Sequence, residues 1–270
     1  MVQMGEVTAL NVFPVKGMRG VPSEEALVET RGLRGDRRWI VTDHEGVFLT
    51  QRNEPSLATF DAHLVGEHLM IKHVECGLAM IPVPKRNERP VVVWRDTVEA
   101  RDAGIMATQW ISKALNRPAR LFYMPEASKR PTDPQFSELG DHVSFADGFP
   151  VLVTNTASLK DLNSKMAEAV GMDRFRSNIV VTGFESYEED GWRRLSIGGV
   201  NFRAVKPCGR CIVTTTDQRT GERKGNEPLT TLASSHLIGQ AAVFGMNLIP
   251  ESGGVIRVGD PVSILATSEP

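Results

Sequence analysis

The sequence has few cysteines and no long apolar segment. Its 270 residues include three cysteines, Cys76, Cys208 and Cys211, and so sparse and odd a set argues against a disulfide-stapled extracellular scaffold. No stretch approaches the roughly 18 apolar residues of a membrane span, and the N-terminus lacks a charged segment followed by an apolar one. We therefore predict a cytoplasmic protein with no membrane partner.

The sequence also lacks an excess of charge of either sign. Lys and Arg number 31 against 33 Asp and Glu, which gives a formal net charge of -2. Because no global positive field would attract a polyanion, no nucleic-acid partner is expected and any anion site must be local. The hydrophobic fraction of 41% is enough to fill a folded core.

Strand signals dominate the chain. Short β-branched and alternating runs separated by Gly, Pro and Asn predict many strands, as in barrels and sandwiches. They include residues 68–73, 78–83, 90–98, 178–181, 194–197, 200–205, 212–216 and 262–265. Helical spacing of apolar residues predicts helices over 105–115 and 159–170, the second with Ser158 as N-cap. The polar segment 126–139 predicts a long surface loop that begins the second half.

The densest group of reactive side chains is Lys206, Cys208, Arg210 and Cys211. A zinc half-site would need a second pair of closely spaced ligands, which the sequence lacks. A redox dithiol usually begins a helix, whereas a β-branched run follows here. Two small buried hydrophobic residues are the commonest outcome for intracellular cysteines. The remaining interpretation is a metal-ligating or nucleophilic thiolate, which the two flanking cations favour.

Two further groups combine basic residues with turns. Lys16 and Gly17 form one turn, and Gly35 and Arg37 another; such turns either bind an anion through backbone N–H groups or are ordinary solvated turns. The third group, residues 174–178, places two arginines and an asparagine before a strand, where a surface salt bridge is the ordinary expectation.

Taken in order, these segments resemble a known family. VFPVKGMRG, GLRGDRRWIVTDHEGVFLTQRNEPSLA, RFRSNIVV, KPCGRCIVTTTDQRTG and VGDPV are similar to MOSC-domain proteins with an N-terminal MOSC β-barrel domain, relatives of the mitochondrial amidoxime reducing component and its bacterial counterparts. The resemblance spans about residues 5 to 266. It implies a β-rich α+β fold of two domains: an N-terminal MOSC β-barrel domain over 1–123 and a MOSC β-barrel domain with peripheral helices over 124–270.

The resemblance also implies a cofactor and its binding residues. The cofactor is the molybdenum cofactor, Mo-molybdopterin, held between the two domains, with Cys211 as metal ligand and catalytic residue. The cofactor-binding residues that the family pattern indicates are Lys16, Gly17, Arg37, Arg176, Asn178, Cys208 and Arg210. The family usually has serine where this chain has Gly17, so only a backbone N–H can serve there.

The implied activity is a molybdenum-dependent oxidoreductase. It would reduce N-hydroxylated compounds, namely hydroxylamines, amidoximes and N-hydroxylated bases, by oxygen-atom abstraction. The sequence has no Rossmann or P-loop fingerprint, so electrons are expected from a separate donor protein, a flavin reductase or a ferredoxin-like protein. The alternatives are a carrier of the molybdenum cofactor, a sulfur carrier without turnover, or a structural relative that has lost the cofactor. Replacing Lys16 or Arg37 is expected to lower cofactor occupancy and to change stability little.

Overall fold

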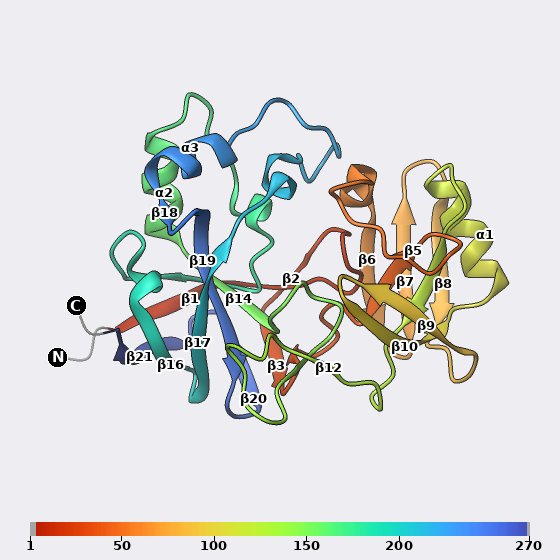
Figure 1. The fold of residues 1–270 in the computed structure, drawn as a ribbon, viewed down its shortest axis with the longest axis horizontal. Coiled ribbons are helices and arrows are strands. Elements are labelled where there is room, and N and C mark those ends of the chain that lie inside the picture. The colour runs from red at the N-terminus through yellow and green to blue at the C-terminus, as the bar shows by residue number, and fades with distance from the viewer. Residues whose placement is uncertain (1–3, 269–270) are drawn as a thin grey trace.

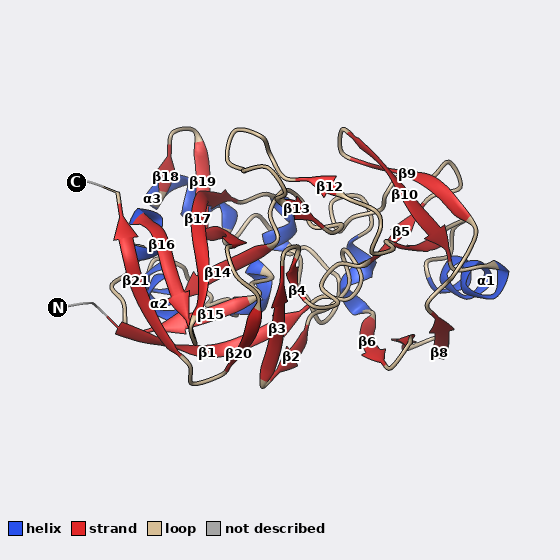
Figure 2. Ribbon diagram, turned by 90° about the horizontal axis from the view of Figure 1, so that it is seen from below, coloured by secondary structure: helices blue, strands red, loops and turns tan. Residues whose placement is uncertain are grey.

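The computed structural model describes residues 4–268, which form two β-rich units side by side along the long axis of the molecule (Figure 1). The larger unit carries both ends of the described chain. Seen from below, strands dominate both units and loops fill the region between them (Figure 2). Within residues 4–268 there are three α-helices, and this β-rich α+β fold with a closed barrel confirms the predicted fold class.

The larger unit is built on a closed ring of seven strands. The ring runs β14, β15, β1, β21, β16, β17 and β19, and hydrogen bonds between β19 and β14 close it. In chain order these strands are β1 (Met4–Val12), β14 (Val151–Asn155), β15 (Ile179–Thr182), β16 (Trp192–Ile197), β17 (Val200–Gly209), β19 (Ala241–Pro250) and β21 (Pro261–Thr267). Their alternating side chains, with Trp192, Leu195 and Phe202 among them, make the apolar core of this unit.

Shorter elements surround the barrel. β2 (Val21–Ser23) pairs with β1 and β18 (Leu237–Ile238) with β19, while β20 (Gly254–Arg257), β3 (Glu25–Glu29) and β4 (Gly32–Leu33) form a small sheet. Helices α2 (Thr156–Ser164) and α3 (Leu229–Ser235) lie together beside the barrel (Figure 1). A second cluster of buried apolar residues, in which Phe175 stacks on Phe244 at 3.9 Å between ring centroids, packs with these helices.

The smaller unit contains two antiparallel sheets and one helix. The first sheet has the order β5 (Trp39–Thr42), β11 (Arg120–Tyr123), β10 (Asp96–Asp102) and β9 (Glu88–Val93); the second has β6 (Asp61–Val65), β7 (His68–His73) and β8 (Gly77–Pro82). Helix α1 (Ile105–Ala114) buries Ala107 and Ile111 against this unit's core. The helix and the strands β7 and β8 lie within one residue of their predicted positions.

Strand pairing connects the beginning of the chain with its end. β1 pairs with β15 and β21, and β3 pairs with β20, so strands β1 to β4 share sheets with the second half of the sequence. The chain then crosses to the smaller unit and returns through an irregular segment that carries the short strands β12 (Arg130–Pro131) and β13 (His142–Val143). The division into domains at 1–123 and 124–270 stays a prediction.

Several local predictions were wrong. The run at 90–98 is not one strand, because it crosses the turn between β9 and β10, and the helix predicted to reach residue 170 ends at Ser164. Residues 212–216 do not form a strand, because Ile212–Thr215 is a 3-10 helix (η4) in which the Thr214 and Thr215 hydroxyls donate to carbonyls three residues earlier, at 3.0 and 2.8 Å. Helix α2 begins earlier than predicted because Asn155, not Ser158, caps it: its side chain accepts a hydrogen bond from the Ala157 N–H at 3.1 Å.

A buried carboxyl in the 3-10 helix Glu188–Gly191 (η3) leads to a stability prediction. Glu189 is fully buried, accepts hydrogen bonds from Ser158 at 2.9 Å, and has its pKa raised by burial from 4.5 to about 7. The folded state therefore retains a proton that the unfolded chain loses. The resulting contribution to the free energy of unfolding is fully present below pH 4.5 and is lost as the pH rises through 7.

We expect Glu189→Gln to flatten the pH dependence of unfolding. Because glutamine cannot ionise, the decrease in unfolding free energy between pH 5 and pH 8 should be smaller in the variant by about 2 kcal/mol. Urea titrations at several pH values measure this, with the exposed Glu168→Gln as control. Parallel pH profiles of wild type and Glu189→Gln would contradict the assignment.

Candidate functional site

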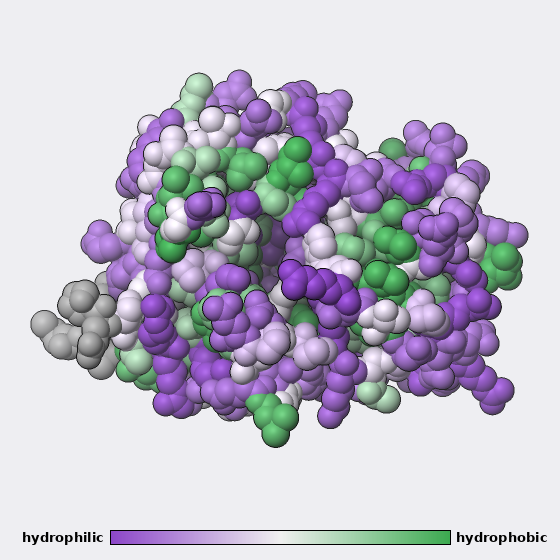
Figure 3. Space-filling model, in the orientation of Figure 1, coloured by the Kyte–Doolittle hydropathy of each residue, from purple (hydrophilic) through white to green (hydrophobic). Residues whose placement is uncertain are grey.

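A cavity of about 740 Å³ lies between the two units and opens on the face shown in Figure 3. All eight residues predicted as site residues line it: Lys16, Gly17, Arg37, Arg176, Asn178, Cys208, Arg210 and Cys211. They come from segments more than 190 residues apart in the sequence, and the fold brings them to one place. Their chemical roles stay predictions.

The turn after β1 places Lys16 inside the cavity wall. The Lys16 N–H donates to the Trp39 carbonyl at 2.8 Å, and the next residue, Gly17, has φ +85°, a conformation that side chains rarely adopt. The Lys16 ammonium is buried and pairs with the Asp147 carboxylate. Burial lowers the pKa of Lys16 and the Asp147 charge opposes that shift, so a cation is held here by its counter-charge.

Arg37 is fixed by a buried network. Its guanidinium donates to the Asp36 carboxylate at 2.5 Å, to the Asn178 side-chain oxygen at 3.1 Å and to the Arg176 carbonyl at 3.2 Å. The Asn178 amide in turn donates to Asp36 at 3.0 Å and to the Asn11 carbonyl at 3.2 Å. Asn178 thus uses its hydrogen-bonding groups within the protein, and what it does in the cavity is to position Arg37.

Arg176 differs from Arg37 because no carboxylate of the described residues forms an ion pair with it. Its guanidinium lies 4.5 Å from the centroid of the Phe13 ring and donates to the Gln218 side chain at 3.3 Å. Burial, and next the like charge of Arg37, lower the pKa of Arg176 to about 9. The charges of Asp36 and Asp147 partly oppose this shift, but a half-buried cation that forms no ion pair favours an anion beside it.

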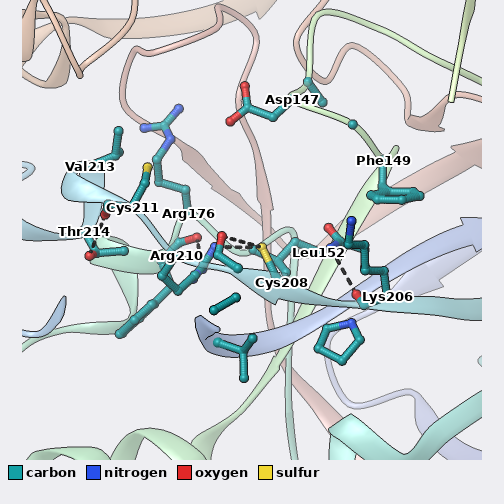
Figure 4. A pocket seen from close by; sticks show the side chains of 18 of the residues that line it. Asp147, Phe149, Leu152, Arg176, Lys206, Cys208, Arg210, Cys211, Val213 and Thr214 are labelled. Carbon is teal, nitrogen blue, oxygen red and sulfur yellow. Dashed lines mark hydrogen bonds between the residues drawn. The ribbon is translucent and has the colours of Figure 1, made fainter. Parts of the chain in front are cut away.

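The two cysteines line the same cavity, Cys208 at the end of β17 and Cys211 at the start of η4. Neither is an inert core residue, because both are half-buried and line the cavity. Figure 4 shows both on the segment that carries Arg210, with Asp147 and Phe149 on a different segment. Arg210 donates to the Cys208 sulfur at 3.0 Å and to the Phe175 carbonyl at 2.7 Å.

Cys211 is the less constrained of the two thiols. Its Sγ forms no hydrogen bond with any residue in the described range, while its carbonyl accepts two bonds of 3.0 Å, from the N–H and the hydroxyl of Thr214. Between residues 4 and 268 no group of three or more His, Cys, Asp or Glu could hold a metal ion, so the zinc interpretation finds no ligand set there. The thiol of Cys211 is available to a ligand in the cavity.

Sequence reasoning missed some of the residues that shape this cavity. Arg174 was noted but not assigned; it donates to the Thr215 carbonyl at 2.9 Å and pairs with Asp217 at 3.3 Å, which ties η4 to the 3-10 helix Met172–Phe175 (η2). Asp147 was not singled out, and its one sequence signal is an Asp-Gly pair just after the polar loop. Arg130 fixes the segment that carries Asp147, through the carbonyls of Ser144 and Asp147 at 3.2 and 3.1 Å.

The cavity is strongly basic although the chain as a whole is not. Its lining includes seven cationic side chains, at positions 16, 37, 52, 174, 176, 206 and 210, against two carboxylates, Asp133 and Asp147. A concave surface with an excess of positive charge concentrates the field and attracts anions. Fold and cavity together define a class of protein: a two-unit β-rich protein with a closed barrel and a basic cavity that contains a free thiol.

Comparison with known proteins places the chain within this class. The sequence matches the MOSC N-terminal beta barrel domain over residues 4–118 and the MOSC domain over residues 140–263, and the chain belongs to this family of two-part MOSC proteins. Its relatives include human mitochondrial amidoxime-reducing component 1, 36% identical over 97% of this chain and 84% of the relative. The mouse counterpart is 33% identical over 97% and 83%, and human component 2 is 33% identical over 96% and 83%.

These relatives support membership of a reductase family associated with the molybdenum cofactor. The relatives are named mitochondrial, and the cytoplasmic localisation of this chain stays a prediction. In residues 4–268, no helix combines the length and the apolar character needed to cross a membrane.

Proposed function

We propose that this protein binds the molybdenum cofactor and reduces N-hydroxylated compounds. The observation that carries the proposal is the free Sγ of Cys211 in the same cavity as the basic cradle, which we define as Lys16, Gly17, Arg37 and Arg176. When bound, the cofactor would supply the two-electron chemistry that removes oxygen from an N–O group. The names of the relatives point to amidoximes as one class of substrate.

The residues present fit the anionic part of this cofactor. A pterin phosphate is a dianion near neutral pH, and Arg176 is a half-buried cation that forms no ion pair among the described residues. Lys16 would add a second charge, with Asp147 beside it as counter-charge when the cradle holds no anion. The Gly17 N–H can donate without a side chain in the way. Arg37, held by Asp36 and Asn178, would form the rigid back of the cradle.

The residues present also fit a soft metal. Sulfur is a suitable ligand for such a metal and binds as thiolate. The two hydrogen bonds from Thr214 to the Cys211 carbonyl fix the backbone at Cys211, so the thiol would be held in position before the cofactor arrives. Arg210 holds the Cys208 sulfur, which would lie near the metal without binding it.

The test is a cofactor-loaded preparation assayed with a chemical reductant. Protein made in a host that supplies the cofactor should contain molybdenum by elemental analysis and pterin by fluorescence. Hydroxylamines, amidoximes or N-hydroxylated bases should then reoxidise dithionite-reduced viologen only when this protein is present. If fully loaded protein gives no such reoxidation but transfers its pterin to an apo-molybdoenzyme, the protein is a cofactor carrier and the reductase proposal fails.

We expect loaded protein to be inactive with NADH or NADPH alone. The chain has no dinucleotide-binding fingerprint, so electrons would have to come from a separate flavin reductase or ferredoxin-like protein. Product formation from benzamidoxime, measured by chromatography, should begin only after such a donor or reduced viologen is added. The rate should increase with donor concentration while the donor is scarce. Sustained turnover with a nicotinamide nucleotide alone would contradict this expectation.

A further inference from the structure

The outer part of the cavity carries two cations that the cradle does not use. Arg52 lies over the ring of Trp94, 4.3 Å from the centroid, and the Lys206 ammonium lies over the ring of Phe136, at 4.7 Å. Arg52 and Lys206 are exposed, whereas Lys16 of the cradle is buried, so the cradle lies deeper in the cavity. We call Arg52, Trp94, Phe136 and Lys206 the rim of the cavity. Figure 4 shows Lys206 on the side away from Cys211.

Neither rim cation forms an ion pair with the described residues, although the charge of Arg52 contributes to the lowered pKa of Asp147. Within the described residues, Arg52 and Lys206 take part in no ion pair, and each lies on an aromatic ring instead of against a carboxylate. A ring holds a cation in place without cancelling its charge. Of the two exposed carboxylates of the lining, Asp147 pairs with Lys16, and Asp133 accepts a hydrogen bond from the Gln135 N–H at 3.1 Å in its own loop.

The rim is also prepared in advance. The Arg52 carbonyl accepts a hydrogen bond from Arg223 at 3.3 Å, and the Lys206 carbonyl accepts one from Asn247 at 3.0 Å, so both backbones are anchored. Long side chains that already rest on rings lose less conformational entropy when a ligand arrives.

Trp94, which belongs to the rim, has an unfavourable backbone conformation. It has φ +57° in the turn between β9 and β10, a conformation that is unfavourable for a bulky residue. Three contacts hold it there: Arg52 over its ring, the edge of Phe48 at 4.9 Å between centroids, and a hydrogen bond from its indole N–H to Asp147 at 3.3 Å. Strain of this kind persists where surrounding contacts enforce it, and it clusters at binding sites.

We propose that Arg52 and Lys206 form a subsite for an anionic group, a carboxylate or phosphate, on a planar substrate whose N–O group enters the deeper part of the cavity. This inference rests on the proposed function and specifies its substrate class. The aromatic rings of the rim suit a planar substrate body, and cations that form no ion pair suit a negative substituent. Substrates that carry such a group are preferred over neutral ones of the same shape.

The activity test uses a matched pair of substrates, benzamidoxime and 4-carboxybenzamidoxime. Loaded wild type should have the higher kcat/KM for the carboxylate, and this preference should fall about three- to tenfold in Arg52→Gln and in Lys206→Gln. The change should appear mainly in KM, and added salt should weaken the wild-type preference. Lys160→Gln removes one exposed charge from α2, outside the cavity, and should retain the preference.

A binding test separates this inference from the proposed reduction. The non-reactive pair benzamide and 4-carbamoylbenzoate is titrated against loaded protein while tryptophan fluorescence is followed, and Trp94→Phe identifies the signal of Trp94. The carboxylate should bind more tightly, and Arg52→Gln and Lys206→Gln should remove that advantage. If the carboxylate bound selectively but no substrate were reduced, the proposed subsite would be supported and the proposed reductase activity would be contradicted. An unchanged affinity ratio in both variants would reject the subsite, and loss only in Lys16→Gln would assign the anion to the cradle.

Discussion

Cys211→Ala should abolish molybdenum-dependent reduction of benzamidoxime and should lower bound molybdenum in protein from a cofactor-supplying host. An alanine methyl group cannot replace an anionic sulfur ligand. The substitution should leave the fold intact, because the Cys211 thiol is half-buried and forms no hydrogen bond with the described part of the chain. The free energy of unfolding should therefore change by no more than about 0.5 kcal/mol. Elemental analysis, viologen reoxidation and thermal melts measure these three outcomes.

Cys208→Ala is the matched control for this prediction. Both cysteines line the same cavity and are similarly buried, but the Cys208 sulfur already accepts a hydrogen bond from Arg210. Its removal should leave most of the bound molybdenum and a measurable rate. If Cys208→Ala lost more molybdenum and more activity than Cys211→Ala, the ligand assignment would move to Cys208.

Arg37→Ala should destabilise the protein even without cofactor, contrary to the expectation from the sequence. From the sequence, replacement of Arg37 is expected to change stability little. In the structure, however, Arg37 pairs with Asp36, whose carboxylate is 2% exposed. Breaking a buried pair leaves an uncompensated charge, although two hydrogen bonds to Asp36, from the Phe13 N–H and from Asn178, would remain. We expect a loss of about 3 kcal/mol, or roughly 5–10 °C in Tm for a chain of this size.

Lys16→Ala is the comparison that separates stability from binding. Its partner Asp147 has a side chain that is 65% exposed, so water can solvate the carboxylate when the ammonium is removed. Lys16→Ala should therefore lower cofactor occupancy with little change in the apo melting temperature. The double variant Asp36→Asn with Arg37→Ala should recover part of the stability lost in Arg37→Ala. Equal melting temperatures for Arg37→Ala and wild type would contradict a structural role for this pair.

The sequence predicts the residues of this site better than their local structure. Cys208, Arg210 and Cys211 were identified by their spacing and their neighbours, and they do line the cavity. The strand predicted after them was wrong because β-branched residues are common in strands, whereas Thr214 and Thr215 use their hydroxyls to close a 3-10 turn. The β-propensity of a residue reflects the shape of its side chain and does not include hydrogen bonds from its hydroxyl to the backbone.

Contacts between distant segments could not be predicted from the sequence. The Lys16 pair with Asp147 joins residues 131 positions apart, and the Arg37 bond to Asn178 joins residues 141 positions apart. No periodicity or motif specifies such pairs, because they arise only when the strands have assembled. The strands β14 and β19, which close the barrel, were missed for a related reason: both are almost entirely buried and so lack the alternation that marks a strand with one face in water.

The position of β1 in the barrel has a topological consequence for the cavity. Because β1 lies between β15 and β21, the smaller unit is an insertion within the chain that forms the ring: the chain leaves after β4 and returns before β14. Lys16 lies in the turn between β1 and β2, and Asp147 lies on the returning segment. The ion pair between them therefore joins the returning segment to the turn that follows β1. An anion bound at Lys16 would compete with Asp147 for the ammonium, and so would change how firmly the returning segment is held.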